Sequence, residues 1–135
     1  MDIDKALAIS AAGMQVQTTR LRVIAENLAN QDSTATGPNG TPYRRKVVTF
    51  ENRLDAALGT ETVRIGRVGT DPAELPKRYD PSHPAADAQG YVQTPNVNPF
   101  VETMDMRAAE RSYSANLNVM QASRNMLSRT IDLLK

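Results

Sequence analysis

The sequence predicts a mainly α fold, in which long N- and C-terminal helices pair as an antiparallel coiled coil and a small β-rich loop domain lies between them in the chain. Apolar residues recur at helical three- and four-residue spacing near both ends of the chain. No proline follows Pro99 and no glycine follows Gly90, so nothing interrupts a final helix. We therefore assign residues 1–34 to the first helix of a coiled-coil rod domain, 35–100 to a β-rich insert, and 101–135 to the last helix.

The composition of the chain excludes several classes of function. A length of 135 residues favours one domain, and a net charge of +1 gives no field to recruit nucleic acid or a membrane surface. Cysteine is absent, which excludes disulfides and thiolate metal sites. No run approaches the roughly 18 apolar residues of a membrane span. The first residues also lack the basic segment of a cleaved secretory signal.

Residues 2–31 are expected to form the first helix, beginning at Asp2 or Asp4, because carboxylates suit the unpaired amides of a helix start. Gly13 is costly in mid-helix, and its expected use is the close approach of a neighbouring backbone. One line of residues has coiled-coil spacing: Leu7, Ala11, Met14, Thr18, Leu21, Ala25 and Leu28. A second apolar face carries Ile9, Ala12, Val16 and Val23. The helix ends in an asparagine-rich segment that can adopt a left-handed C-cap.

The insert begins with a dense turn signal over residues 37–42. Strands are predicted over residues 43–50 and 63–68. In the second, apolar and charged residues alternate until Gly66, where a bulge would break the pattern. The polar stretch between them, residues 51–62, is either a loop or one short helical turn. Prolines then dominate, and extended segments are expected at residues 75–79 and 91–94.

The last helix has more apolar surface than one contact can bury. One stripe is Met106, Ala109, Tyr113, Leu117, Met120, Leu127, Ile131 and Leu134, and a second is Ala115, Val119, Ala122, Met126 and Leu133. The helix would be roughly 50 Å long, whereas a compact domain of this size is only about 30 Å wide. We expect the first stripe to pair with the N-terminal helix and the second to meet other subunits.

Candidate catalytic groups are few. His83, the single histidine, lies in a proline-framed loop without the cysteine or histidine partners of a metal site, and a structural loop role is favoured. Glu102 and Asp105 are interpreted as helix-start acids that complement the helix dipole. Asp80 and Asp87 are a carboxylate pair only by count. The basic residues Arg44, Arg45 and Lys46 are expected on solvated strand faces, or as ion-pair partners across a subunit contact.

Two stretches resemble a known family. The segment from Asn27 to Thr34, followed by Gly37, resembles the signature that closes the N-terminal helix of bacterial flagellar rod and hook axial proteins. The segment Arg111–Asn116 resembles their C-terminal helix motif. Within that family, the short length and the segment from Tyr79 to Asn98 most resemble the proteins of the proximal rod. The motif residues are Asn27, Leu28, Ala29, Asn30, Thr34, Gly37, Ser112, Tyr113 and Asn116.

The resemblance implies a structural subunit without enzymatic activity or cofactor, which polymerises into the tubular drive shaft that transmits torque from motor to hook. Its partners would be other copies, other flagellar rod proteins, the junction protein of the MS ring and export gate, and the flagellar type III export apparatus. It would lie in the periplasmic rod of the basal body, exported without a cleaved signal. The residues expected to pack between helices and subunits are Leu7, Met14, Leu21, Leu28, Tyr113, Leu117, Met120, Leu127, Ile131 and Leu134.

Two alternatives remain open from the residues. The first is a coiled-coil adaptor or chaperone of the flagellar export system that never polymerises, which would form a closed oligomer of defined size. The second is a small hydrolase that uses Asp80 and Asp87, which a turnover assay on substitutions of both residues would detect.

Overall fold

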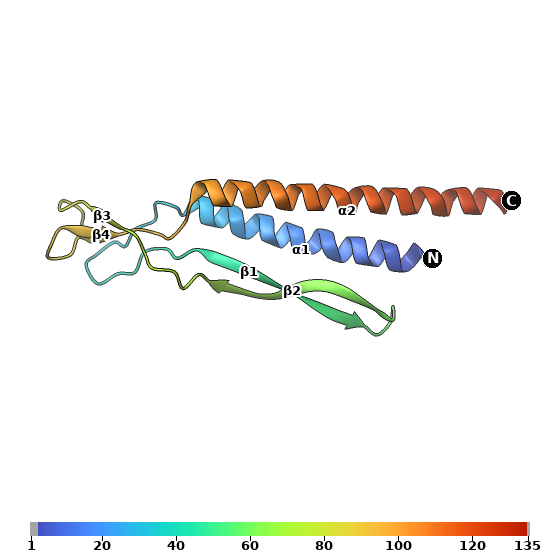
Figure 1. The fold of residues 1–135 in the computed structure, drawn as a ribbon, viewed down its shortest axis with the longest axis horizontal. Helices are drawn as coiled ribbons and strands as arrows, with labels where there is room; N and C mark the ends of the chain where they lie inside the picture. The colour runs from blue at the N-terminus through green and yellow to red at the C-terminus, as the bar shows by residue number, and fades with distance from the viewer. Residues whose placement is uncertain (1–2, 135) are drawn as a thin grey trace. The chain divides into compact units, whose positions relative to one another are not determined.

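The structure is a computed structural model that describes residues 3–134, so the expected helix start at Asp2 lies outside the described residues. Those residues form, in chain order, two helices and four strands (Figure 1). They are α1 (Ile3–Ala29), β1 (Lys46–Asp55), β2 (Thr60–Thr70), β3 (Lys77–Tyr79), β4 (Tyr91–Gln93) and α2 (Pro99–Leu133). The prediction of a mainly α fold with a small β insert is confirmed.

Strand β1 pairs with β2, and β3 pairs with β4, giving separate two-stranded sheets within the described range. The expectation of a loop or helical turn over residues 51–62 is wrong, because β1 continues to Asp55 and β2 begins at Thr60. The carboxylate Oδ1 of Asp55 closes the short turn by accepting the backbone N–H groups of Ala57 at 3.0 Å and Leu58 at 3.3 Å. Every residue of this hairpin is exposed or half-buried, so no apolar alternation marked its middle part, residues 51–62.

The β3–β4 sheet lies at the expected extended segments. Its strands are antiparallel, with Lys77 opposite Gln93, Arg78 opposite Val92 and Tyr79 opposite Tyr91. The rings of the last pair meet edge to face with centroids 5.3 Å apart, a favourable aromatic geometry. On the other face Val92 is only 1% exposed, so this small sheet buries one side chain as its anchor.

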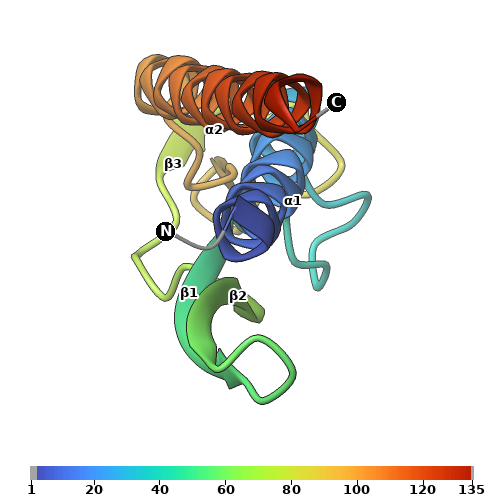
Figure 2. The same ribbon diagram turned by 90° about the vertical axis from the view of Figure 1, so that its right-hand side faces the viewer.

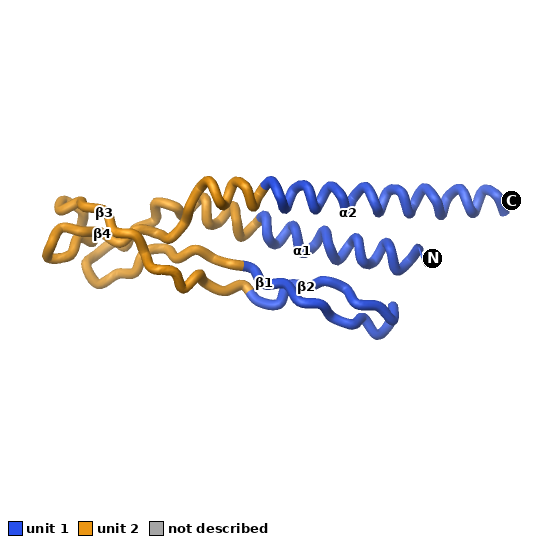
Figure 3. The backbone as a smooth tube through the Cα atoms, viewed as in Figure 1, with its two compact units in different colours: residues 1–21, 48–67, 107–135 blue, residues 22–47, 68–106 orange. Residues whose placement is uncertain are grey.

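The chain divides into two compact units, coloured separately in Figure 3. One unit comprises Met1–Leu21, Val48–Arg67 and Arg107–Lys135, and the other comprises Arg22–Val47 and Val68–Met106. In the first unit the α1 and α2 segments lie alongside each other, as Figures 1 and 2 both show. A Cβ placed on Gly13 would lie 2.8 Å from the side-chain nitrogen of Asn116. Gly13 thus admits a neighbouring side chain, where the sequence predicted a neighbouring backbone.

The second unit contains the end of α1 and the start of α2. Asn98 caps α2, because its Oδ1 accepts the N–H of Phe100 at 3.0 Å, and Pro99 occupies the first helical position, which it favours. At the end of α1, the side chain of Asn30 donates back to the carbonyl of Glu26 at 2.8 Å. No non-glycine residue among those described has a positive φ angle, so the expected left-handed C-cap is not formed.

Candidate functional site

A buried polar junction in the second unit is formed by Asn27, Tyr43, Arg45, Lys46 and Glu102. Asn27 is 1% exposed, and its amide uses every hydrogen-bonding position that an asparagine has. Its Nδ2 donates to the carbonyl of Lys46 at 2.9 Å and to Oε2 of Glu102 at 3.1 Å. Its Oδ1 accepts the N–H of Lys46 at 2.9 Å and the hydroxyl of Tyr43 at 2.7 Å. The residue therefore joins α1 to α2 and to the start of β1.

Glu102 is the charged centre of this junction and is 0% exposed. Its second oxygen, Oε1, accepts a short charge-assisted bond from Nε of Arg45. Arg45 also meets Asp71 at 3.4 Å and Asp105 at 3.7 Å. The interpretation of Glu102 as a dipole-compensating acid missed this role, since a carboxylate without solvent needs a cationic partner.

The basic cluster forms ion pairs within the chain. Burial lowers the pKa of Arg45, but hydrogen bonding and charge from Glu102, and then from Asp71, raise it to a net value above the ordinary one. The ammonium of Lys46 lies 2.6 Å from a carboxylate oxygen of Glu26. Arg45 and Lys46 thus form ion pairs within the chain, where the sequence predicted solvated strand faces or ion pairs across a subunit contact.

Tyr43 completes the junction from the segment before β1. Burial, followed by the charges of Glu26 and Glu102, raises the pKa of its hydroxyl above the ordinary value of 10.0. The hydroxyl therefore stays protonated and can donate to Asn27. The backbone N–H of Tyr43 donates to the carbonyl of Ser33 at 3.0 Å, which holds this segment against the chain that leaves α1.

Other residues of the N-terminal motif organise the turn after α1. The hydroxyl of Ser33 donates to Asn30 at 3.1 Å. The Oγ1 of Thr34 lies 3.1 Å from Nε2 of His83. Because Nδ1 of His83 accepts the N–H of Ala85 at 3.0 Å, the proton of a neutral ring is on Nε2 and faces Thr34. His83 therefore links two loops, as favoured from the sequence. Of the remaining motif residues, Leu28 is half-buried, Ala29 is exposed, and the Gly37 carbonyl accepts the N–H of Gly40 at 3.0 Å.

The C-terminal motif lies on the side of α2 that meets α1. Tyr113 and Ser112 are half-buried, and Asn116 donates to the carbonyl of Ser112 at 3.0 Å while lying against Gly13. Asn116 therefore lies at the contact with α1. Asn118 is exposed.

The residues expected to pack between helices and subunits differ in exposure. Half-buried members are Leu7, Met14, Leu21, Leu28, Tyr113 and Met120. Exposed members are Leu117 at 37%, Leu127 at 38%, Ile131 at 48% and Leu134 at 83%. On α1 the buried positions lie instead at Ser10, Val16, Val23, Ile24 and Asn27. The residues expected to pack between helices and subunits are therefore only partly covered within the chain, and those towards the end of α2 are exposed.

A second apolar stripe on α2 is exposed along its whole length. We call this surface the outer stripe; it consists of Ala115, Val119, Ala122, Met126 and Leu133. Val119 and Met126 are each 50% exposed, and Leu133 is 87% exposed. So long a line of exposed apolar side chains is typical of a surface that meets another protein.

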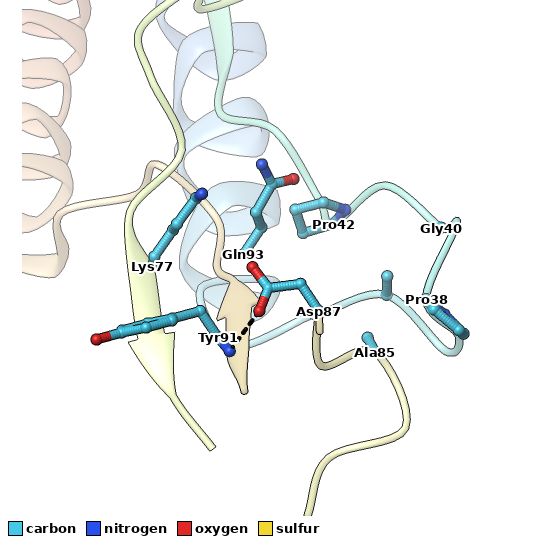
Figure 4. Close-up of a pocket in the computed structure, with 9 residues that line it drawn as sticks. Pro38, Gly40, Pro42, Lys77, Ala85, Asp87, Tyr91 and Gln93 are labelled. Atoms are coloured by element: carbon cyan, nitrogen blue, oxygen red, sulfur yellow. Dashed lines mark hydrogen bonds between the residues drawn. The ribbon is translucent and has the colours of Figure 1, made fainter. Parts of the chain in front are cut away.

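A pocket of about 210 Å³ lies between the loop at residues 35–42 and the β3–β4 sheet (Figure 4). Its walls carry Lys77 and Asp87, but the Asp87 Oδ1 accepts the N–H groups of Gln89 at 3.0 Å and Tyr91 at 2.9 Å. Asp80 likewise accepts the hydroxyl of Ser82 at 2.8 Å. Both carboxylates stabilise local turns, which leaves no support for the hydrolase alternative.

Within residues 3–134, no three histidine or acidic side chains are grouped so as to hold a metal ion. Over the same range, neither helix has a segment apolar enough to span a bilayer.

Comparison with known proteins identifies the family. The family described as flagellar basal body rod FlgEFG protein C-terminal matches residues 88–133. The flagellar basal-body rod protein FlgC of Agrobacterium fabrum is 47% identical over 133 residues, covering 98% of this chain and 96% of that protein. The FlgC proteins of Salmonella typhimurium and Bacillus subtilis are 40% and 35% identical, covering 93% and 96% of this chain and 92% and 96% of their own lengths.

Proposed function

Since this chain belongs to the FlgC family of flagellar basal-body rod proteins, we propose that it polymerises into the proximal part of the tubular rod that transmits torque from motor to hook. It is a structural subunit of the flagellar basal-body rod and not an enzyme. The observation that carries the polymerisation proposal is the exposed outer stripe of α2.

The outer stripe suits an assembly that extends indefinitely. A stripe of alternating alanines and larger apolar residues can receive side chains of a neighbouring helix. When such a surface meets a different surface on the next copy, the contact does not close on itself and generates a helical filament or tube. In the rod, this surface would contact other copies of the chain and other rod components.

The proposed rod domain is an antiparallel pair of α1 and α2. Two separate contacts support it, because Gly13 lies against Asn116 while Asn27 bonds to Glu102. A later residue of α1 thus meets an earlier residue of α2, as antiparallel helices require. Most of the buried and half-buried positions of α2 also follow four- and three-residue steps, as in a coiled coil: Glu102, Met106, Ala109, Tyr113, Asn116, Met120 and Ser123.

We also propose that the chain reaches the periplasm through the flagellar type III export apparatus without a cleaved signal, and contacts the junction protein of the MS ring and export gate. Membership of the rod family supports this route. A further support is that α1, from Ile3 onward, already contributes packed residues such as Ser10 and Val16 to the fold.

The test of assembly is Val119→Asp in a strain that expresses the variant as its sole copy. The side chain is 50% exposed, so the subunit itself should fold normally. Burying the new carboxylate at a contact repeated in every subunit carries a large desolvation cost. We expect no rods in isolated basal bodies by electron microscopy, and no swimming in soft agar, while export of the subunit continues.

The matched control is Asn118→Asp, which adds the same charge at the neighbouring exposed position, off the outer stripe. It should assemble and swim normally. Normal rods with Val119→Asp would show that the outer stripe is not an assembly surface.

A further inference from the structure

We propose that Asn27 sets the register in which α1 meets α2, and does so only when the segment 43–46 has docked against it. The inference rests on the proposed pairing of the two helices. It concerns how one alignment of that pair is selected over others that the same helices would tolerate.

The first step is that the apolar contacts between the helices select an alignment only weakly. Small residues such as Ser10, Gly13 and Ala109 leave a shallow surface, and Met106 and Met120 adapt to different neighbours. Small and flexible side chains of this kind accept other apolar neighbours at little cost. Something other than apolar packing must therefore distinguish the native alignment.

The second step is that the Asn27 amide fits one alignment alone. Each of its four hydrogen bonds goes to a different atom, at distances between 2.7 and 3.1 Å. A shift of one helical turn moves a residue by about 5.4 Å, which exceeds the length of any hydrogen bond. Three of the bonds go to the segment 43–46, and the fourth goes to Glu102 on α2. A shift of α1 against α2 would break the bond to Glu102, which would lose a partner where no water replaces it. Buried asparagines are known to fix helix register in this way.

The third step concerns the segment 43–46. The Asn27 amide exchanges an N–H and a C=O bond with the backbone of Lys46, as a neighbouring strand would. Tyr43 fills the remaining acceptor position, and Arg45 neutralises Glu102. If the helices met before this segment docked, the carboxylate of Glu102 would be buried without its cation. Docking of the insert and alignment of the helices are therefore one event.

The absence of cysteine from the chain permits a direct test by disulfide cross-linking of the full-length protein. The native reporter carries Gly13→Cys and Asn116→Cys, at positions that are in contact. Shifted reporters combine Gly13→Cys with Tyr113→Cys or Met120→Cys, about one turn away in either direction, and carry Asn116→Ala so that the new side chain at position 13 does not meet the amide. Each reporter is oxidised with and without Asn27→Leu, and cross-linked chain is quantified on non-reducing gels.

With Asn27 present, the native pair should cross-link and the shifted pairs should not. With Asn27→Leu, we expect the ratio of native to shifted cross-links to fall at least about fivefold. The control Asn118→Leu makes the same change at an exposed position and should preserve the ratio. Should Asn27→Leu precipitate, Asn27→Gln serves instead, because it keeps the amide but displaces it.

An unchanged ratio in Asn27→Leu would overturn the proposal. Loss of the native cross-link without a gain of shifted cross-links would do so as well, since Asn27 would then stabilise the fold without selecting the register. Failure of the native pair to cross-link when Asn27 is present would instead refute the helix pairing on which the inference rests. The role of the segment is tested by Tyr43→Phe, which should shift the ratio in the same direction by a smaller amount.

Discussion

Replacement of Glu102 by glutamine should destabilise the protein severely despite the near-identical shape of the two side chains. Glu102 is 0% exposed and accepts bonds from Arg45 and Asn27. Glutamine can accept only through its oxygen. If that oxygen faces Arg45, its NH₂ group faces the NH₂ of Asn27, and two donors oppose each other. Asn27 cannot rotate to relieve this, because its oxygen is required by Tyr43 and by the N–H of Lys46.

The magnitude follows from the surroundings of Arg45. Removing one partner of a buried ion pair costs about 3–5 kcal/mol. Arg45 is 20% exposed and keeps Asp71 at 3.4 Å, which favours the lower end of that range. Opposed donors at Asn27 contribute part of the same loss, so we expect about 3 kcal/mol in total.

Urea unfolding followed by circular dichroism measures this loss. With a denaturant slope of about 2 kcal/mol per molar, the midpoint should fall by about 1.5 M. Glu110→Gln is the matched control, since it makes the same change at an exposed position on the same helix, and its midpoint should hardly move. A loss for Glu102→Gln no greater than that of the control would refute the argument that this carboxylate holds the junction together.

Two further predictions concern Gly13 and Tyr43. Gly13→Ala alone should not stabilise the protein, because the new Cβ meets Asn116. In an Asn116→Ala background the same change should add about 1 kcal/mol to the free energy of unfolding through better helix propensity. Equal effects in both backgrounds, measured by urea unfolding, would exclude the close contact. Since the folded-state pKa of Tyr43 lies above its ordinary value of 10.0, its contribution to stability is complete below the ordinary pKa and is lost as the pH rises through the folded value. Unfolding midpoints compared between about pH 9 and about pH 11 should fall more steeply for the parent chain than for Tyr43→Phe, and parallel curves would contradict the raised pKa.

The helices and the insert could be predicted from the sequence because local signals there are strong. The run without glycine or proline after Pro99 predicts α2, and the Asn98–Pro99 pair marks its start, although the predicted bound fell two residues later, at Val101. The first predicted strand, residues 43–50, begins before β1 (Lys46–Asp55) and ends before it. The polar second half of β1 gives no alternation, because most of the hairpin is solvated on both faces.

The polar junction could not be predicted because its signals are ambiguous along the chain. An acid in the first turn of a helix usually complements the helix dipole, so there was no reason in the sequence to expect Glu102 in a buried ion pair. A basic run such as Arg44–Lys46 is usually solvated. Only the fold brings these residues together with Asn27, across separations of up to 75 residues in sequence. The one available signal was a polar residue, Asn27, on a side of the helix shared with Val23 and Ile24.

The exposed β1–β2 hairpin could allow subunits to aggregate through their strands, which a protein that polymerises through its helices must avoid. Within the described residues, β1 and β2 form a sheet of their own, so apart from Lys46, whose backbone bonds to Asn27, each strand keeps an edge that no third strand covers. Such edges recruit strands from other chains and can lead to amyloid-like aggregates. Here the strands carry charged side chains, including the ion pair between Glu51 and Arg64, and charge at an edge discourages strand addition. Crowded subunits are thereby steered towards contacts between helices and away from a growing sheet.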